Sequence, residues 1–84
     1  MYQDTRRRVL RVLTSYGDLF FGQPAVLSRA DLPSLVGTTR EMTGRVIPAL
    51  EREGVVARVG RRGLALLSAE GLQRALDPSA EDRD

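Results

Sequence analysis

Apolar residues near the start of the chain recur at three- and four-residue intervals: Val9, Val12, Leu13 and Tyr16. This spacing places them on one face of a helix, which we predict over residues 4–16, with arginines on most of the other face. Gly17 is expected to end the helix. The following segment GDLFFGQPA, residues 17–25, is expected to be a loop because it contains glycine and proline.

The next apolar positions predict a short strand and a short helix. Residues 26–27 are expected to form a very short strand. Ser28 and Asp31 have the spacing of an N-cap and its acidic partner, which predicts a helix over about residues 29–35. Gly37 is expected to end that helix. The residues expected to be buried here are Leu32, Leu35 and Val36.

A longer helix is predicted over about residues 39–52. Two threonines are candidate caps, since Thr38 has capping-box spacing to Glu41 and Thr39 could cap instead. The residues at helical spacing that are expected to face the core are Thr43, Val46, Ile47 and Leu50. The hydroxyl of Thr43 would then be buried and would need a hydrogen-bond partner.

Two further apolar segments, VVARV and LALL, flank the sequence GRRG. Apolar runs on either side of a turn flanked by glycines predict a β-hairpin, with Arg61 and Arg62 at its tip. Ser68 is expected to cap a last helix over residues 69–76. The order helix, helix, turn, helix, hairpin predicts a mainly α-helical fold with a small β-hairpin (α+β), a winged helix-turn-helix, over residues 1–76.

Composition excludes several classes of function. A chain of 84 residues with 42% hydrophobic and 29% charged residues is typical of one small globular domain. It has no cysteine and no histidine, which excludes disulfides and removes the commonest metal ligands and acid–base groups. It shows no nucleophile–base pair and no phosphate-cradling glycine loop, so we expect neither enzymatic activity nor a cofactor. Without a membrane-length apolar run or a signal peptide, a cytoplasmic location is expected.

The charge is unevenly placed along the chain. All thirteen basic residues are arginine. The last eight residues, DPSAEDRD, hold four acids and one arginine, and we expect residues 77–84 to be a flexible acidic tail. Residues 1–76 hold twelve arginines and seven acidic residues, a net charge of +5. A basic body of this kind suggests a polyanionic partner, most often nucleic acid.

The solvent-facing side of the 39–52 helix begins with polar residues and a glycine: Arg40, Glu41, Gly44 and Arg45. A helix in the major groove presents its first two turns to the bases. The fork of an arginine matches guanine O6 and N7, and a glutamate can accept from cytosine N4. We therefore expect Arg40, Glu41 and Arg45 to read bases, with Gly44 allowing close approach to DNA. In the alternative, both arginines are solvated surface residues paired with Glu41 and Glu51.

The segment SRADLPSLVGTTREMTGRVIPALEREGVV resembles the DNA-binding domain of the Crp–Fnr transcription regulators, the catabolite activator protein family. The resemblance extends from RRRVLRVL to EGLQRAL and covers roughly 70 residues. It implies a bacterial, nucleoid-associated regulator that binds a two-fold DNA site as a homodimer.

The resemblance also implies roles for individual residues. In the catabolite-activator branch an R-E-x-x-x-R motif reads the bases, which carries over to Arg40, Glu41 and Arg45 and implies a half-site like TGTGA. The phosphate contacts that the resemblance implies are Arg29, Thr39, Arg61 and Arg62. The family's loop before the helix-turn-helix can touch RNA polymerase. For Phe20 and Phe21, which lie in that segment, we favour packing in the core or between domains.

Three features depart from the family. The family's large N-terminal sensor domain and long dimerisation helix are missing from these 84 residues, which are either an excised domain or a naturally short protein; these residues are not expected to bind a cyclic nucleotide, haem or iron–sulfur cluster. Thr43 stands where valine is usual. Pro48 lies inside the helix predicted over about residues 39–52, the recognition helix, where it removes one hydrogen bond and presses on the carbonyl of Gly44. We expect the helix to bend or tighten between residues 44 and 48, and a phosphate contact from position 48 to be lost.

A second function stays open on the sequence alone. A winged helix can serve as a protein-contact module, in assembly with RNA polymerase or another regulator, without sequence-specific DNA binding. Such a module would expose apolar residues on the face of the recognition helix. This chain instead exposes arginine, glutamate and glycine there, which favours DNA.

Overall fold

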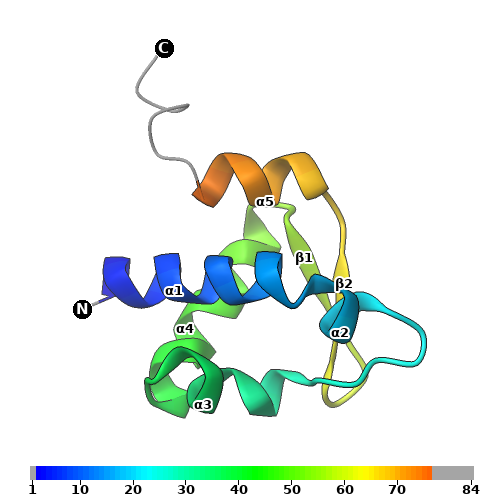
Figure 1. The fold of residues 1–84 in the computed structure, drawn as a ribbon. Coiled ribbons are helices and arrows are strands. Elements are labelled where there is room, and N and C mark those ends of the chain that lie inside the picture. The colour runs from blue at the N-terminus through cyan, green and yellow to red at the C-terminus, as the bar shows by residue number, and fades with distance from the viewer. Residues whose placement is uncertain (1, 77–84) are drawn as a thin grey trace.

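The computed structural model describes residues 2–76, and these form a series of helices and one antiparallel hairpin (Figure 1). The helices are α1 (Tyr2–Ser15), α2 (Gly17–Phe21), the 3-10 helix η1 (Arg29–Asp31), α3 (Leu32–Val36), α4 (Arg40–Arg52) and α5 (Ala69–Leu76). The strands are β1 (Val56–Val59) and β2 (Gly63–Leu66). The predicted class, a mainly helical winged helix-turn-helix, is confirmed. The acidic tail expected over residues 77–84 lies outside the described residues.

Helix α1 is the centre of the core. In Figure 1 it crosses the molecule between α5 on one side and α3 on the other, and it contacts α4 as well. Its inward side chains Val9, Leu10 and Leu13 are at most 1% exposed. The other buried residues of the same cluster are Phe20, Leu32, Val36, Val46, Ile47, Leu50, Val55, Val56, Leu64 and Leu72.

The segment expected to be a loop begins instead with a short helix, α2. The amides of Leu19 and Phe20 donate to the carbonyl of Tyr16 at 2.9 and 3.2 Å, which closes the first turn. This turn places the ring of Phe20 in the core, as favoured for it, and burying so large an apolar side chain offsets the poor helix propensity of the segment. Tyr16, expected on the apolar face of α1, lies beyond its last residue and is 45% exposed.

Two smaller predictions in the next segment were wrong. Residues 26–27 form no strand, because both amides donate to the carbonyl of Leu19, at 2.8 and 2.9 Å, and not to a neighbouring strand. Leu35 is 40% exposed and not buried. Because α3 is preceded by the 3-10 turn η1, its inward residues are Leu32 and Val36, which are one helical turn apart.

The turn between α3 and α4 is made by three residues. Gly37 ends α3 in the left-handed conformation, with φ of 77°, which glycine adopts without strain. The amides of Gly37 and Thr38 both donate to the carbonyl of Pro33, at 2.9 and 3.0 Å. Thr39 is then the cap of α4, since its Oγ1 accepts from the amide of Met42 at 3.2 Å. The choice between the two candidate caps is thereby settled, and the start of α4 is fixed.

The hairpin and the last helix form as predicted. β1 and β2 pair in antiparallel register, with Val59 opposite Gly63 next to the turn. Gly60 makes the turn with φ of 62°. After β2, the Oγ of Ser68 accepts from the amide of Gly71 at 2.9 Å and so caps α5.

Phe20→Ala is expected to destabilise the domain by ~3–5 kcal/mol, because a fully buried ring is replaced by a cavity. A domain of this size holds in total only roughly 0.05–0.15 kcal/mol of stability per residue, so much of the variant should be unfolded at room temperature. Val26→Ala is the control, because Val26 is 70% exposed; its effect should stay within about 0.5 kcal/mol. Urea unfolding followed by circular dichroism measures both, and equal losses would contradict the packing described for Phe20.

Candidate nucleic-acid interface

The start of α4 presents the three residues expected to read bases. Arg40, Glu41 and Arg45 are all exposed. The opposite face of the helix is buried, with Thr43, Val46, Ile47, Ala49 and Leu50 in the core. Because the cap fixes the first turn and the core face fixes the rotation of the helix, the three polar side chains project from a rigid element.

Glu41 and Arg45 form an ion pair one helical turn apart, with 3.3 Å between Oε2 and Nη2. Their side chains are 77% and 63% exposed, so water and salt weaken the pair and leave both groups available to a ligand. Within residues 2–76 the side chain of Arg40 has no hydrogen-bonding or ionic partner. Glu51 pairs with Arg58, so of the alternative surface pairings only Glu41 with Arg45 is formed.

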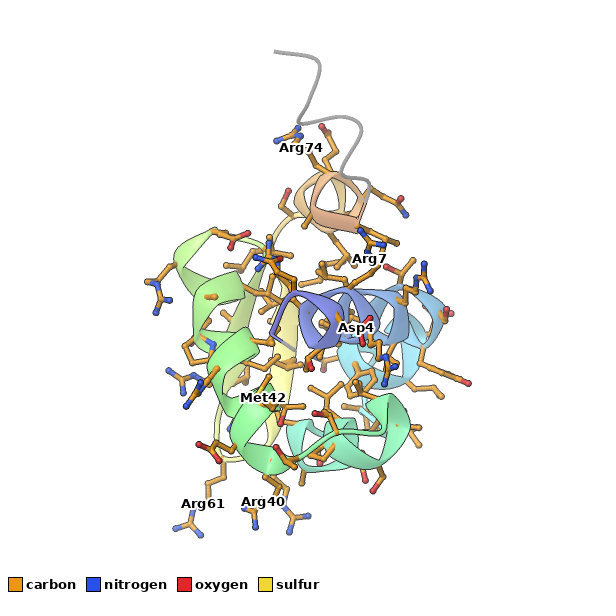
Figure 2. All side chains as sticks on the ribbon, turned by 90° about the vertical axis from the view of Figure 1, so that its left-hand side faces the viewer. Asp4, Arg7, Arg40, Met42, Arg61 and Arg74 are labelled. Carbon is orange, nitrogen blue, oxygen red and sulfur yellow. The ribbon has the colours of Figure 1, made fainter. Side chains whose placement is uncertain are left out.

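One arginine of the hairpin turn, Arg61, lies near this face. Arg61 and Arg62 are both exposed. In Figure 2 the side chains of Arg40 and Arg61 extend from the same end of the molecule, and Arg74 lies at the other end. The recognition helix α4 and the β1–β2 hairpin, which we call the wing, can therefore face one ligand together.

A shallow groove separates α4 from the hairpin. It is lined from α4 by Arg40, Thr43, Gly44, Ile47 and Pro48, and from the other elements by Arg29, Ala30, Leu32, Pro33, Arg58 and Arg61. The lining holds four arginines and no acidic residue. A groove lined by charge of one sign raises the local concentration of the opposite ion, here an anion.

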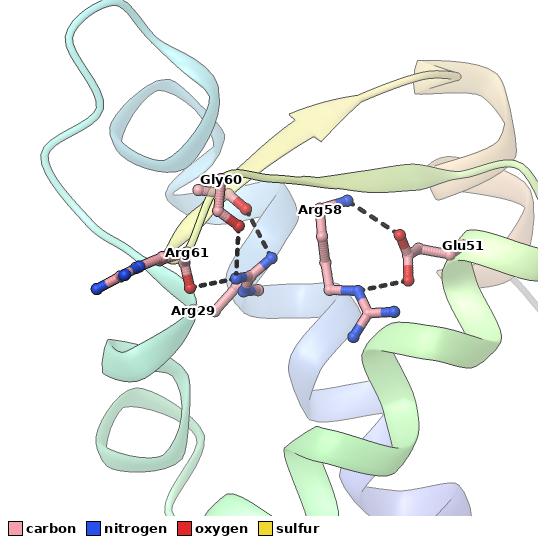
Figure 3. A network of polar contacts seen from close by, with 6 residues as sticks. Arg29, Glu51, Arg58, Gly60 and Arg61 are labelled. Atoms are coloured by element: carbon pink, nitrogen blue, oxygen red, sulfur yellow. Dashed lines mark hydrogen bonds and ion pairs between the residues drawn. The ribbon is translucent and has the colours of Figure 1, made fainter.

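Two of the four residues expected to contact phosphate already have partners within the domain. The guanidinium of Arg29 donates to backbone carbonyls of the hairpin turn (Figure 3). The Oγ1 of Thr39 accepts from an amide of α4, which leaves its hydroxyl hydrogen free to be donated to a phosphate oxygen. Arg61 and Arg62, the other two, project into solvent.

The role of Arg58 was not predicted from the sequence. Its Nε lies 2.7 Å from Oε1 of Glu51, and its amide donates to Oε2 of the same carboxylate at 3.1 Å (Figure 3). This double contact attaches β1 to the second half of α4. Glu51 lies on a helix and Arg58 on a strand, so no helical or strand spacing in the sequence indicates that they are in contact. A charged residue inside a mainly apolar strand was the only available signal.

Thr43 and Pro48, the two departures within α4, are both accommodated. The Oγ1 of Thr43 donates to the carbonyl of Arg40 at 3.1 Å, which satisfies the buried hydroxyl. Helix α4 stays α-helical from Arg40 to Arg52, through Pro48, without a change to a tighter helix type. A bend at this point, and the loss of a phosphate contact there, stay predictions.

The sequence matches the family model of the Crp-like helix-turn-helix domain over residues 7–75. The chain belongs to this family. It is also 37% identical over 71 residues to the HTH-type transcriptional regulator Rv1719 of Mycobacterium tuberculosis, in an alignment that covers 81% of this chain and 27% of that protein. The chain thus spans about a quarter of the length of this relative. No solved structure matches it.

The Crp-like domain is a DNA-binding element of transcription regulators and not an enzyme class. Two observations on residues 2–76 accompany this assignment. No group of three or more histidine, cysteine or acidic residues there could hold a metal ion. No helix in that range is long and apolar enough to cross a membrane.

Pro48→Ala is expected to stabilise the domain by about 1–3 kcal/mol, because alanine restores an amide that can donate to the carbonyl of Gly44. Pro33→Ala is the matched control. Pro33 lies in the first turn of α3, where a missing amide costs little, so no gain is expected from its replacement. Thermal unfolding followed by circular dichroism measures both variants. A lower melting temperature for Pro48→Ala would show that α4 is shaped to require the proline.

Proposed function

We propose that this domain binds double-stranded DNA in a sequence-specific manner to regulate transcription, with α4 in the major groove. The observation that carries the proposal is the exposed face of Arg40, Glu41 and Arg45 on a rigid, capped helix. Arg61 of the wing lies at the same end of the molecule as Arg40 (Figure 2). The similarity to the M. tuberculosis protein, a transcriptional regulator by name, supports the same assignment.

Base readout falls to the first two turns of α4. Arg40 and Arg45 each offer a planar fork for O6 and N7 of a guanine. Glu41 either accepts from a cytosine amino group or holds Arg45 in place, as it does in the free domain. A half-site like TGTGA contains two guanines on one strand, and its complement supplies cytosines, which suits this set of side chains.

Phosphate contacts position the helix in the groove. Arg61 and Arg62 at the wing tip and the hydroxyl of Thr39 at the start of α4 are the groups proposed for this role. Thr39 is the cap of α4 and Arg61 lines the groove beside Arg40, so both are placed to help hold α4 against the DNA backbone. Arg29 is the remaining candidate, and most of its guanidinium is occupied by the hairpin.

The regulator is proposed to act as a homodimer on a two-fold site, with half-sites about 34 Å apart. One domain engages one half-site, so the isolated chain is expected to bind weakly compared with a linked pair. RNA polymerase is a second proposed partner. A purely protein-binding role is less well supported, because the exposed face of α4 carries charged side chains and not apolar ones.

Fluorescence anisotropy with a TGTGA–TCACA duplex and a scrambled duplex tests the proposal. Non-specific binding should lie near 10⁻⁴–10⁻⁶ M and weaken steeply with salt. The palindrome should bind at least about tenfold tighter than the scrambled duplex, and Arg45→Ala should remove that excess, a loss of ~1–3 kcal/mol. Arg74→Ala removes the same charge at the other end of the molecule and should leave the excess intact.

Each result of this titration has a definite meaning. If both duplexes bind equally, the domain is non-specific or reads another half-site, and selection from random DNA separates these two. If neither duplex binds at low salt, DNA binding is excluded and the protein-contact function takes its place.

Gly44→Ala should change stability and DNA affinity in opposite directions. No atom outside its own helix and chain neighbours lies within 4 Å of a Cβ placed there, and alanine favours the helix, so the free domain should gain about 0.5–1 kcal/mol. The added methyl group lies on the DNA-facing side, so affinity for the palindrome should fall. Thermal unfolding and anisotropy measure the two effects. Unchanged affinity would show that the backbone of α4 does not approach the DNA closely at this point.

A further inference from the structure

Every carbonyl oxygen of the hairpin turn accepts a hydrogen bond from a single residue, Arg29. Its Nη1 donates to the carbonyl of Gly63 at 3.1 Å, and its Nη2 donates to those of Gly60, at 3.2 Å, and Arg61. Its backbone amide donates to the carbonyl of Arg62 at 2.9 Å. We call this set of four contacts the Arg29 clamp. The side chain of Arg61 extends away from it (Figure 3).

The clamp joins two parts of the domain that lie about thirty positions apart in the sequence. Arg29 is the first residue of η1, where the helix-turn-helix begins, and the four carbonyls belong to the wing tip. The capping box of Ser28 and Asp31 holds the backbone around Arg29, with the amide of Ser28 donating to Oδ2 of Asp31 at 2.8 Å. The backbone that carries Arg29 is therefore held in place by local contacts that do not involve the hairpin turn.

A two-stranded hairpin is marginally stable in water on its own. Here the hairpin buries Val56 and Leu64 in the core, and two polar attachments add to that packing. The pair Glu51–Arg58 holds β1 to α4, and the Arg29 clamp holds the tip to η1. Hydrogen bonds from a charged donor are stronger than those between neutral groups, and a planar guanidinium can serve several acceptors at fixed angles. The position of the wing relative to α4 is thus set in the free domain.

We propose that Arg29 is a positioning residue, which acts on DNA by holding Arg61 and Arg62 at the distance from α4 that the phosphate backbone requires. This role rests on the proposed DNA binding. It differs from that of a phosphate ligand, because the donors of Arg29 are directed to carbonyls of the protein. The wing arginines make the contacts, and Arg29 makes those contacts possible.

Arg29→Lys separates the two roles. Lysine keeps the charge and can replace an arginine as a phosphate ligand, but its compact ammonium cannot reproduce the fork that meets three carbonyls. The clamp therefore predicts that Arg29→Lys weakens binding nearly as much as the double variant Arg61→Ala/Arg62→Ala. Arg74→Lys is the matched control: it makes the same chemical change at the other end of the molecule, outside the proposed interface, and should bind like the unchanged chain.

The salt dependence of binding gives a second, sharper readout. Loss of both wing contacts should reduce the slope of log K against log [salt] by up to ~1.8, since each phosphate contact contributes about 0.9. Arg29→Lys should reduce the slope by a similar amount although the net charge of the protein is unchanged. If Arg29 acts only through the wing arginines, Arg29→Lys has little left to disturb once they are removed. In the Arg61→Ala/Arg62→Ala background, it should therefore add no more than about a twofold loss of affinity, whereas an independent phosphate contact would add its full effect. Full additivity, or an unchanged slope, overturns the proposal.

Measurements on the free protein distinguish failure of the clamp from failure of DNA binding. The steady-state heteronuclear ¹⁵N–¹H NOE of residues 60–63 should fall in Arg29→Lys and Arg29→Ala, while the values in α1 and α4 stay high and thermal unfolding confirms that both variants fold. If the NOE values of the turn do not change, the clamp is overturned whatever the DNA results. If the unchanged chain binds no duplex, the proposed function fails, and the positioning role fails with it, even where the NOE values fall.

Discussion

The packing of α1 is the constraint on which the rest of the structure depends. Its buried side chains Val9, Leu10 and Leu13 meet α3, α4 and α5, so one helix sets the position of the other three. Helix α4 can present a polar face to a ligand only because its apolar face is held against this support. Arg6 adds a polar contact at the rim, 2.7 Å from a carboxylate oxygen of Glu53 just beyond α4. In a domain this small, the core therefore also determines the geometry of the interface.

Helical periodicity and capping residues predicted most of this architecture. The spacing of the core residues in α4, the glycine that ends α3 and the serine before α5 are local signals, and each is confirmed. The errors fell where a distant contact outweighs a local one. Burial of Phe20 converts part of an expected loop into α2, and the short η1–α3 segment turns Leu35 outward. Neither effect produces a periodic pattern of residues that could be recognised in the sequence.

The candidate site divides in the same way. The exposure of Arg40, Glu41 and Arg45 follows from helical phase, so the sequence could predict it. The attachment of the wing could not be predicted, because Arg29 and Arg58 bind groups on other elements. The partners of Arg29 are backbone carbonyls, which carry no sequence signature at all. Because such acceptors cannot be recognised in a sequence, a basic residue near a proposed DNA surface is easily interpreted as a phosphate contact.

The ion pair between Glu41 and Arg45 means that the face proposed to read bases is not simply attractive to polyanions. A carboxylate on a surface that meets DNA is repelled by every phosphate it approaches, and it has a favourable partner only where a cytosine amino group or a suitably placed arginine neutralises it. If α4 docks in the major groove as proposed, Glu41 acts as a barrier to close docking on most sequences. Part of the selectivity of this domain would then come from the rejection of wrong sites. The net positive charge of the surface predicts only a general attraction to DNA and does not reveal this discrimination.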